Sequence, residues 1–177
     1  YVSEEGVSQG LCGEARPTHF KGVTTICAKL FNLVRPAHIA VGQKDAQQVV
    51  VLKRMIRDLH FPIEVVIGPT LREPDGLAMS SRNSYLNDRQ RQDALLIHKA
   101  LQAGKLLVDE KGVRNVDRVK AELMTVLRSG SFVRINYAEV VDRENMKAEK
   151  EIELGRSMLV IAVWVDNIRL IDNILLG

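Results

Sequence analysis

A polar turn that contains a lysine is the segment of this sequence whose residue types best suit a binding site. The turn covers residues 42–48, Gly-Gln-Lys-Asp-Ala-Gln-Gln, between an apolar segment that ends at Val41 and an amphipathic one that starts at Val49. This order predicts a strand, a turn and a helix, so backbone N–H groups and the ammonium of Lys44 would face one ligand beyond the strand. Phosphate is the ligand that such a turn favours. Taken alone, a lysine in a Gly-x-Lys-Asp context is more often a solvated loop residue.

A second polar cluster follows downstream and could close on the same anion. Residues 79–83 read Met-Ser-Ser-Arg-Asn. The hydroxyls of Ser80 and Ser81 donate hydrogen bonds without adding charge, and the guanidinium of Arg82 can bind phosphate oxygens through two parallel hydrogen bonds. Such a triplet is common in loops, so the cluster indicates polyphosphate only in combination with the lysine turn.

The histidines give weaker signals. Arg16 and His19 precede another predicted helix start and form a third candidate anion contact, although a histidine such as His19 is more often a packing or surface residue. His38, His60 and His98 have no cysteine or acidic partners at metal-ligand spacing, so the sequence predicts no metal site. Walker A, G-x-S-x-G and G-x-G-x-x-G patterns are absent, which leaves P-loop, serine hydrolase and dinucleotide-binding functions without support.

Composition indicates an ordinary globular protein of one or two small domains. The 177 residues are 46% hydrophobic and 27% charged, and 25 basic against 22 acidic residues give a net charge of +3. These charges are mixed along the chain and form no basic groove, so we expect no nucleic-acid partner. No apolar run could span a bilayer, so we expect no membrane partner. Cys12 and Cys27 are too few for a disulfide framework, and we expect reduced thiols in a cytoplasmic protein.

The lysine turn lies inside a predicted strand–helix–strand unit. Residues 1–15 are expected to be loop, and a helix follows Gly22 and ends before Pro36, with an inward face of Val23, Ile26, Cys27, Leu30, Phe31 and Val34. A short buried strand at 39–41, a helix at 49–59 and a strand at 63–67 form a βαβ unit with parallel strands. Asp45 is expected to cap the helix, with Gln48 as its partner in a capping box.

Composition shifts after Gly68 toward a loop at residues 69–87. Asn87 and Asn115 are expected to cap two helices, and strands follow at 135–141, 158–165 and 168–171, the last two joined by a hairpin at Asp166-Asn167. The fold class is therefore α/β, a parallel sheet followed by a small α+β domain with antiparallel strands. The expected domains are residues 1–69 and 70–177.

Four segments in order resemble the pantothenate synthetase family. They are LCGEARPTHFKGV at 11–23, KLFNLVRP at 29–36, VGQKDAQQ at 41–48 and PTLREPDGLAMSSRNSYL at 69–86, and RLIDN at 169–173 also fits. The family belongs to the nucleotidylyltransferase superfamily. The resemblance implies that residues 1–69 are the C-terminal half of a Rossmann-like nucleotide-binding domain and that residues 70–177 are the whole C-terminal domain.

The resemblance also implies a reaction and a set of site residues. Pantoate attacks the α-phosphorus of ATP·Mg²⁺ to give pantoyl adenylate, and the amine of β-alanine then displaces AMP. The family is cytoplasmic, and the full-length protein is expected to be a homodimer. By resemblance, Lys44, Ser80, Ser81 and Arg82 are catalytic. ATP is bound by Gly42, Gln43, Lys44, Asp45, Leu71, Met79, Ser80, Ser81 and Arg82; pantoate is bound by Gln48, with Arg16 and His19 near the phosphates.

One family feature is missing from this sequence. The histidine-containing, HIGH-like motif of the family, which grips the ATP phosphates, is absent, and so is a second pantoate-binding glutamine. We therefore expect this chain to be the C-terminal part of a longer protein and to be inactive or impaired by itself. A non-catalytic nucleotide-binding or partner-binding module of the same fold is the alternative, and a nucleotidylyltransferase acting on another acid is a third.

Overall fold

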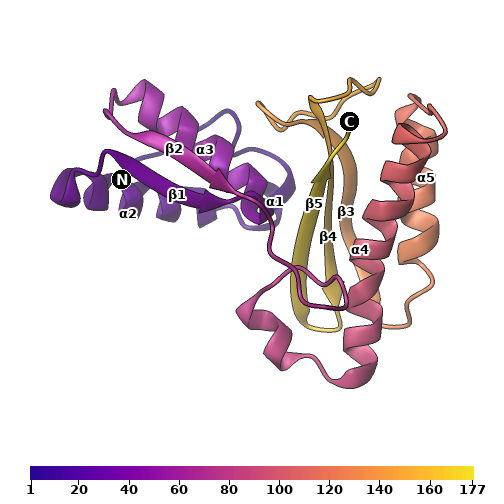
Figure 1. Ribbon diagram of the computed structural model, residues 1–177. Helices are drawn as coiled ribbons and strands as arrows, with labels where there is room; N and C mark the ends of the chain where they lie inside the picture. Colours follow the sequence, from indigo (N-terminus) through magenta and orange to yellow (C-terminus); the bar gives the residue numbers. More distant parts are fainter. The chain divides into compact units, whose positions relative to one another are not determined.

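The predicted strand–helix–strand unit forms in the computed structural model, which describes residues 1–177 (Figure 1). Strands β1 (His38–Gly42) and β2 (Glu64–Gly68) pair in parallel, with His38 opposite Glu64. Between them run the 3₁₀ helix η1 (Gln43–Asp45) and helix α3 (Ala46–Asp58). Helices α1 (Leu11–Ala15) and α2 (His19–Val34) precede them, and all these elements belong to one compact unit, Tyr1–Pro69.

Only one face of this two-stranded sheet is covered. Ile39, Val41 and Val65 pack against a cluster on α2 and α3, which consists of Ala28, Phe31, Leu52, Met55 and Ile56. The alternate residues of β1 are exposed, so the prediction of a buried strand is wrong for that face. A parallel strand is buried on both faces only where both faces carry packed elements.

Helix α2 differs from its prediction in which side chains it buries. Phe31 is buried as the apolar spacing predicts, and Ala28, which is not part of the predicted face, is buried too, but Ile26, Leu30 and Val34 are exposed. The helix also begins at His19, before the predicted start, and α1 forms in a segment predicted as loop. Arg35 ends α2 in the left-handed conformation, with φ of 51°, directly before Pro36.

The second compact unit, Thr70–Gly177, has the predicted antiparallel sheet. Its strands lie in the order β3-β4-β5. The elements are η2 (Ser81–Tyr85), α4 (Asp88–Asp109), α5 (Val116–Leu127), β3 (Val133–Asp142), β4 (Ser157–Val165) and β5 (Ile168–Leu175). Asn87 caps α4 in a complete capping box with Gln90, and Asn115 caps α5, both as predicted. Asp166 has a φ of 56°, as the tight turn between β4 and β5 requires.

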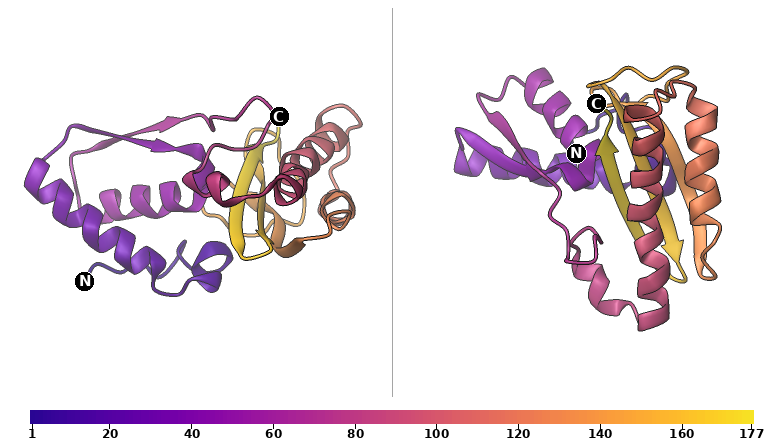
Figure 2. Two further views of the ribbon diagram at one scale, coloured as in Figure 1. Left: turned by 90° about the horizontal axis from the view of Figure 1, so that it is seen from below. Right: turned by 45° about the vertical axis from the view of Figure 1, so that its right-hand side comes forward.

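Helices α4 and α5 cover one face of this sheet and form its core (Figure 2). Leu101 of α4, Leu123 of α5 and Leu159 of β4 are fully buried there. At Gly104 a Cβ would lie 2.8 Å from a methyl carbon of both Leu123 and Leu159, so α4 reaches this depth only with glycine. The α/β class, with a parallel and an antiparallel part, is therefore confirmed. None of the helices is both long and apolar enough to cross a membrane.

Candidate functional site

The lysine turn lies at the carboxyl end of β1, where it passes into α3. Gly42 is the last residue of the strand, Lys44 is the middle residue of η1, and Gln48 lies in the first turn of α3. Open parallel sheets bind ligands at this edge, and the first N–H groups of a helix lack partners within the helix. The geometry therefore suits an anion that contacts both the ammonium and backbone N–H groups.

The predicted capping box at this helix does not form. Asp45 occupies the N-cap position of α3 without a side-chain hydrogen bond, and its φ and ψ of −96° and 52° are not the extended values of a capping residue. The reason is local, because η1 leads directly into α3 and holds Asp45 inside a 3₁₀ turn. Gln48 therefore has no capping task that would compete with a ligand contact.

Gln47, which no sequence motif singles out, is the buried side chain of the turn. It is only 5% exposed, and its amide joins α3 to the loop that precedes α1. Its Oε1 accepts a hydrogen bond from the Cys12 N–H at 3.0 Å, and its Nε2 donates to the carbonyl oxygens of Val7 at 3.0 Å and Gly10 at 3.2 Å. These contacts fix α1 and the loop before it to the start of α3.

Arg16 and His19 follow α1 in the same unit. Arg16 is the exposed C-cap residue of α1, and His19 is the first residue of α2, joined by a hydrogen bond from the His19 N–H to the Arg16 carbonyl at 2.9 Å. The His19 ring lies 5.0 Å from that of Phe20. An open cavity of about 640 Å³ borders this segment, but neither Lys44 nor Gln48 lines it. We therefore base the candidate site on the turn and not on the cavity.

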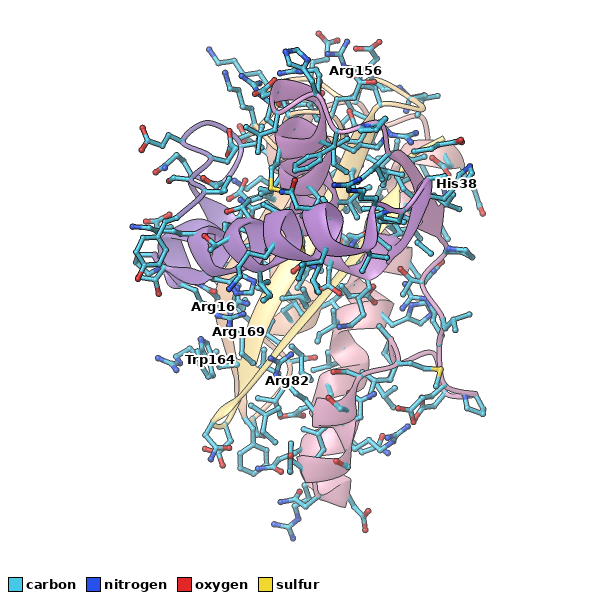
Figure 3. The ribbon with its side chains drawn as sticks, turned by 90° about the vertical axis from the view of Figure 1, so that its left-hand side faces the viewer. Arg16, His38, Arg82, Arg156, Trp164 and Arg169 are labelled. Carbon is cyan, nitrogen blue, oxygen red and sulfur yellow. The ribbon has the colours of Figure 1, made fainter.

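The second candidate segment lies in the other unit. It begins at the exposed end of a short antiparallel ribbon formed by residues 71–79, in which Arg72 pairs with Ala78. The Met79 N–H donates to the Leu71 carbonyl at 2.9 Å, which places these two exposed residues side by side. Ser80 is the N-cap residue of η2, and its Oγ accepts from the Arg82 N–H at 3.3 Å. Ser81 and Arg82 are exposed, and Arg82 is labelled in Figure 3. The structure thus brings Leu71 together with residues 79–82, while Lys44 and Gln48 belong to the first unit.

No three histidine, cysteine, aspartate or glutamate side chains gather into a group that could hold a metal ion. Asp45 is the one carboxylate within the turn. Any cation at this site would therefore depend on oxygens that a ligand supplies.

His98 of α4 packs against the loop that carries the second candidate segment, in surroundings that disfavour the charged imidazolium. Its Nδ1 is buried with no hydrogen-bond partner, and its ring packs against Gly76. Burial lowers the pKa of His98 below its usual 6.5, and the nearby positive charge of Arg72 lowers it further. The folded chain therefore favours the neutral imidazole.

This lowered pKa predicts a pH dependence of stability. As the pH falls below about 7, the unfolded chain binds the proton of His98 before the folded chain does, so the free energy of unfolding decreases. The pKa values of Glu73 and Asp75 are lowered by hydrogen bonds, chiefly from Asn83 and Arg91 respectively, so these carboxyls titrate below that window. We expect His98→Phe to lose less stability between pH 7.5 and 5.5 than the wild type in urea unfolding. Equal losses in both proteins would contradict this assignment.

Comparison with known proteins identifies the family. The family model described as pantoate–β-alanine ligase matches residues 1–175. The chain belongs to the pantoate–β-alanine ligase family. A pantothenate synthetase of Moorella thermoacetica is 48% identical over 176 residues, 99% of this chain and 62% of the relative. One from Pseudothermotoga lettingae is 45% identical over 177 residues, with the same 62% of its length covered.

Solved structures of the pantoate–β-alanine ligase family share this fold. The pantothenate synthetase of Thermus thermophilus matches with a TM-score of 0.93 and 38% identity, over 98% of this chain and 62% of that chain. The ligase of Francisella tularensis, solved with β-γ ATP and β-alanine, matches with a TM-score of 0.72 and 24% identity. The chain thus spans about three fifths of the length of the curated relatives it matches.

Proposed function

We propose that this chain provides ATP- and pantoate-binding segments for the ATP-dependent condensation of pantoate with β-alanine. The observation that carries the proposal is the turn from β1 to α3, which places Lys44 and Gln48 together at the carboxyl end of a parallel strand. Family membership supports this substrate assignment, since relatives matched over nearly the whole chain are pantothenate synthetases. The pantoate carboxylate would attack the α-phosphorus of ATP, and the amine of β-alanine would then displace AMP from pantoyl adenylate.

The residues of the first unit take two roles in this proposal. Lys44 places its ammonium against phosphate oxygens, where it can follow negative charge as it develops in the transition state. Gly42, Gln43 and Asp45 complete the ATP-binding turn, and Gln48 holds pantoate beside it. Arg16 and His19 contribute near the phosphates.

The second unit contributes donors from a loop. Arg82, Ser80 and Ser81 bind phosphate oxygens, and Arg82 supplies the charge that stabilises the departing pyrophosphate. Leu71 and Met79 contact the adenosine end of ATP. In this proposal residues 1–69 are the C-terminal half of a nucleotide-binding domain, and residues 70–177 are a C-terminal domain that adds its own ATP contacts.

The residues of the lysine turn fit Mg²⁺ only when the phosphates of ATP supply most of its ligands. Mg²⁺ is usually held by substrate phosphates and water together with one or two carboxylates. The turn offers the carboxylate of Asp45 and no cluster of three ligands. The proposal therefore assigns Mg²⁺ to the phosphates, where it would neutralise charge. A cytoplasmic, homodimeric enzyme of small-molecule substrates remains part of the same proposal.

Calorimetric titration of the 177-residue chain with ATP·Mg²⁺, in the presence and absence of pantoate, tests the proposed binding role. We expect saturable binding of one nucleotide per chain. A chain that shows no saturable ATP binding up to millimolar concentration would contradict the proposal.

A turnover assay separates catalysis from binding alone. Purified chain with ATP, pantoate and β-alanine is assayed for pantothenate and AMP. Because the chain carries no HIGH-like motif, we expect ATP binding with little or no product. Product at the rate of an enzyme of the family would show that this polypeptide is a complete catalyst, and binding without product would favour the non-catalytic module.

A further inference from the structure

The RLIDN motif at residues 169–173 has no place in the proposed site, yet it contains the most deeply buried carboxylate of the second unit. Asp172 of β5 is 3% exposed and forms a two-pronged ion pair with Arg72. Nη1 of Arg72 lies 2.6 Å from Oδ2 of Asp172, and Nη2 lies 3.1 Å from Oδ1. The two residues are 100 positions apart in the sequence. The pair therefore attaches the loop between β2 and α4 to the C-terminal strand.

Arg72 lies inside the ribbon that carries the second candidate segment. It pairs as an antiparallel bridge with Ala78, and the next hydrogen bond along the ribbon joins Met79 to Leu71. Nη1 of Arg72 also donates to the carbonyl of Gly76 at 3.1 Å. Gly76 forms the tip with a φ of 96°, and a Cβ there would lie 2.4 Å from the His98 ring. One guanidinium thus joins the tip of the ribbon to Asp172 of β5.

Further polar contacts fix η2 and the ribbon tip. Asn83 is buried and donates to the Glu73 carboxylate at 2.5 Å and to the Ala78 carbonyl at 3.1 Å. Arg91 of α4 contacts Glu73 at 2.5 Å and Asp75 at 2.6 Å. Figure 1 shows this loop beside α4 and β5. Buried or paired polar groups therefore hold the ribbon and η2 in place, while Leu71, Met79, Ser81 and Arg82 remain exposed.

A buried ion pair contributes little to stability compared with apolar residues of the same size, because both charges lose their hydration. The two-pronged pair does fix the orientation of the Arg72 side chain, because a planar guanidinium with two hydrogen bonds to one carboxylate cannot rotate. Arg72 follows Leu71 in the chain and pairs with Ala78, the neighbour of Met79, so a fixed Arg72 restricts both exposed residues.

We propose that Asp172 is a positioning residue, which holds Arg72 so that Leu71 and residues 79–82 are presented to ATP in one fixed arrangement. The inference rests on the proposed function, because the nucleotide role of those residues is part of it. In this proposal Asp172 contacts no substrate and acts only through Arg72.

Three variants test the inference. Asp172→Asn keeps the shape and removes the charge, and the double variant Arg72→Met with Asp172→Leu replaces the pair by apolar side chains. Asp142→Asn is the matched control, because Asp142 is also a buried carboxylate of the second unit paired with an arginine, Arg156, at 2.6 Å. Each is compared with the wild type in thermal unfolding, amide hydrogen exchange and ATP·Mg²⁺ calorimetry.

We expect Asp172→Asn to raise amide exchange at Met79 and Glu73, whose N–H groups bond across the ribbon, by at least about tenfold, because local opening of the ribbon becomes easier. ATP affinity should fall by roughly tenfold or more, since small displacements of positioned groups are costly. The double apolar variant should unfold near the wild-type temperature and still bind ATP as weakly as Asp172→Asn. Asp142→Asn should leave ATP affinity unchanged.

The possible results separate a failure of the positioning role from a failure of the proposed function. Wild-type exchange in Asp172→Asn, or full recovery of ATP affinity in the double apolar variant, would overturn the positioning role. An equal loss of affinity in Asp142→Asn would reduce the effect to general destabilisation and would also overturn it. Absence of ATP binding by the wild type would contradict the proposed function instead, and the exchange data alone would then decide whether Asp172 fixes the ribbon.

Discussion

Replacing Lys44 with alanine is expected to weaken ATP·Mg²⁺ binding to this chain by roughly ten- to a hundredfold. A hydrogen bond to a charged group contributes about 1.5–3 kcal/mol, and each 1.4 kcal/mol is about a factor of ten in affinity. Lys44 lies in η1 between the end of β1 and the start of α3, where its charge adds to that of the helix N-terminus. Calorimetry at a fixed ionic strength of about 0.15 M, where the Debye length is about 8 Å, measures the change.

Lys53→Ala is the matched control for this prediction. Lys53 lies on α3, is exposed, and its removal changes the net charge by the same amount. We expect less than about a twofold change, because exposed charges beyond the Debye length are largely screened. Wild-type affinity in Lys44→Ala would remove Lys44 from the site. An equal loss in both variants would attribute the binding to overall charge.

Local signals predicted much of the fold because their causes lie within a few residues. Asn87 and Asn115 cap their helices through hydrogen bonds to backbone three residues away, which the sequence displays directly. The hairpin at Asp166 follows equally from its turn residues. Helix α2 shows the limit, since its spacing predicts an apolar stripe but does not reveal which elements cover it. Leu30 and Val34 are exposed because nothing in the described chain packs on them.

In the candidate site, too, local sequence predicted some features and long-range contacts determined others. The lysine turn could be predicted because strand, turn and helix are consecutive in the sequence, whereas the failed cap at Asp45 depended on backbone angles that the sequence does not show. The supports of the site were not predicted. Gln47 finds its partners 35 to 40 residues away, and Asp172 finds Arg72 at a separation of 100. Such pairings arise only when the chain folds, and no local spacing predicts them.

The adjacent glutamines of α3 provide the second large effect. Gln47→Ala is expected to destabilise the chain by about 1–3 kcal/mol, because the Cys12 N–H and the carbonyls of Val7 and Gly10 would lose a buried partner. Gln48→Ala should change stability by less than about 0.5 kcal/mol, since Gln48 is only partly buried. Urea unfolding at pH 7 measures both changes.

For pantoate binding we expect the opposite ranking, with a larger effect of Gln48→Ala than of Gln47→Ala. Gln48→Ala is expected to remove the effect of pantoate on ATP titrations, whereas Gln47→Ala, measured well below its unfolding temperature, should retain it. The two side chains are chemically identical and leave the helix about 100° apart, so they differ only in what each faces. A pantoate effect that survives in Gln48→Ala and disappears in Gln47→Ala would assign the acid to the loop before α1. Loss in both would mean that the Gln47 contacts hold the turn in its binding conformation, which would make folding of that loop a requirement for pantoate binding.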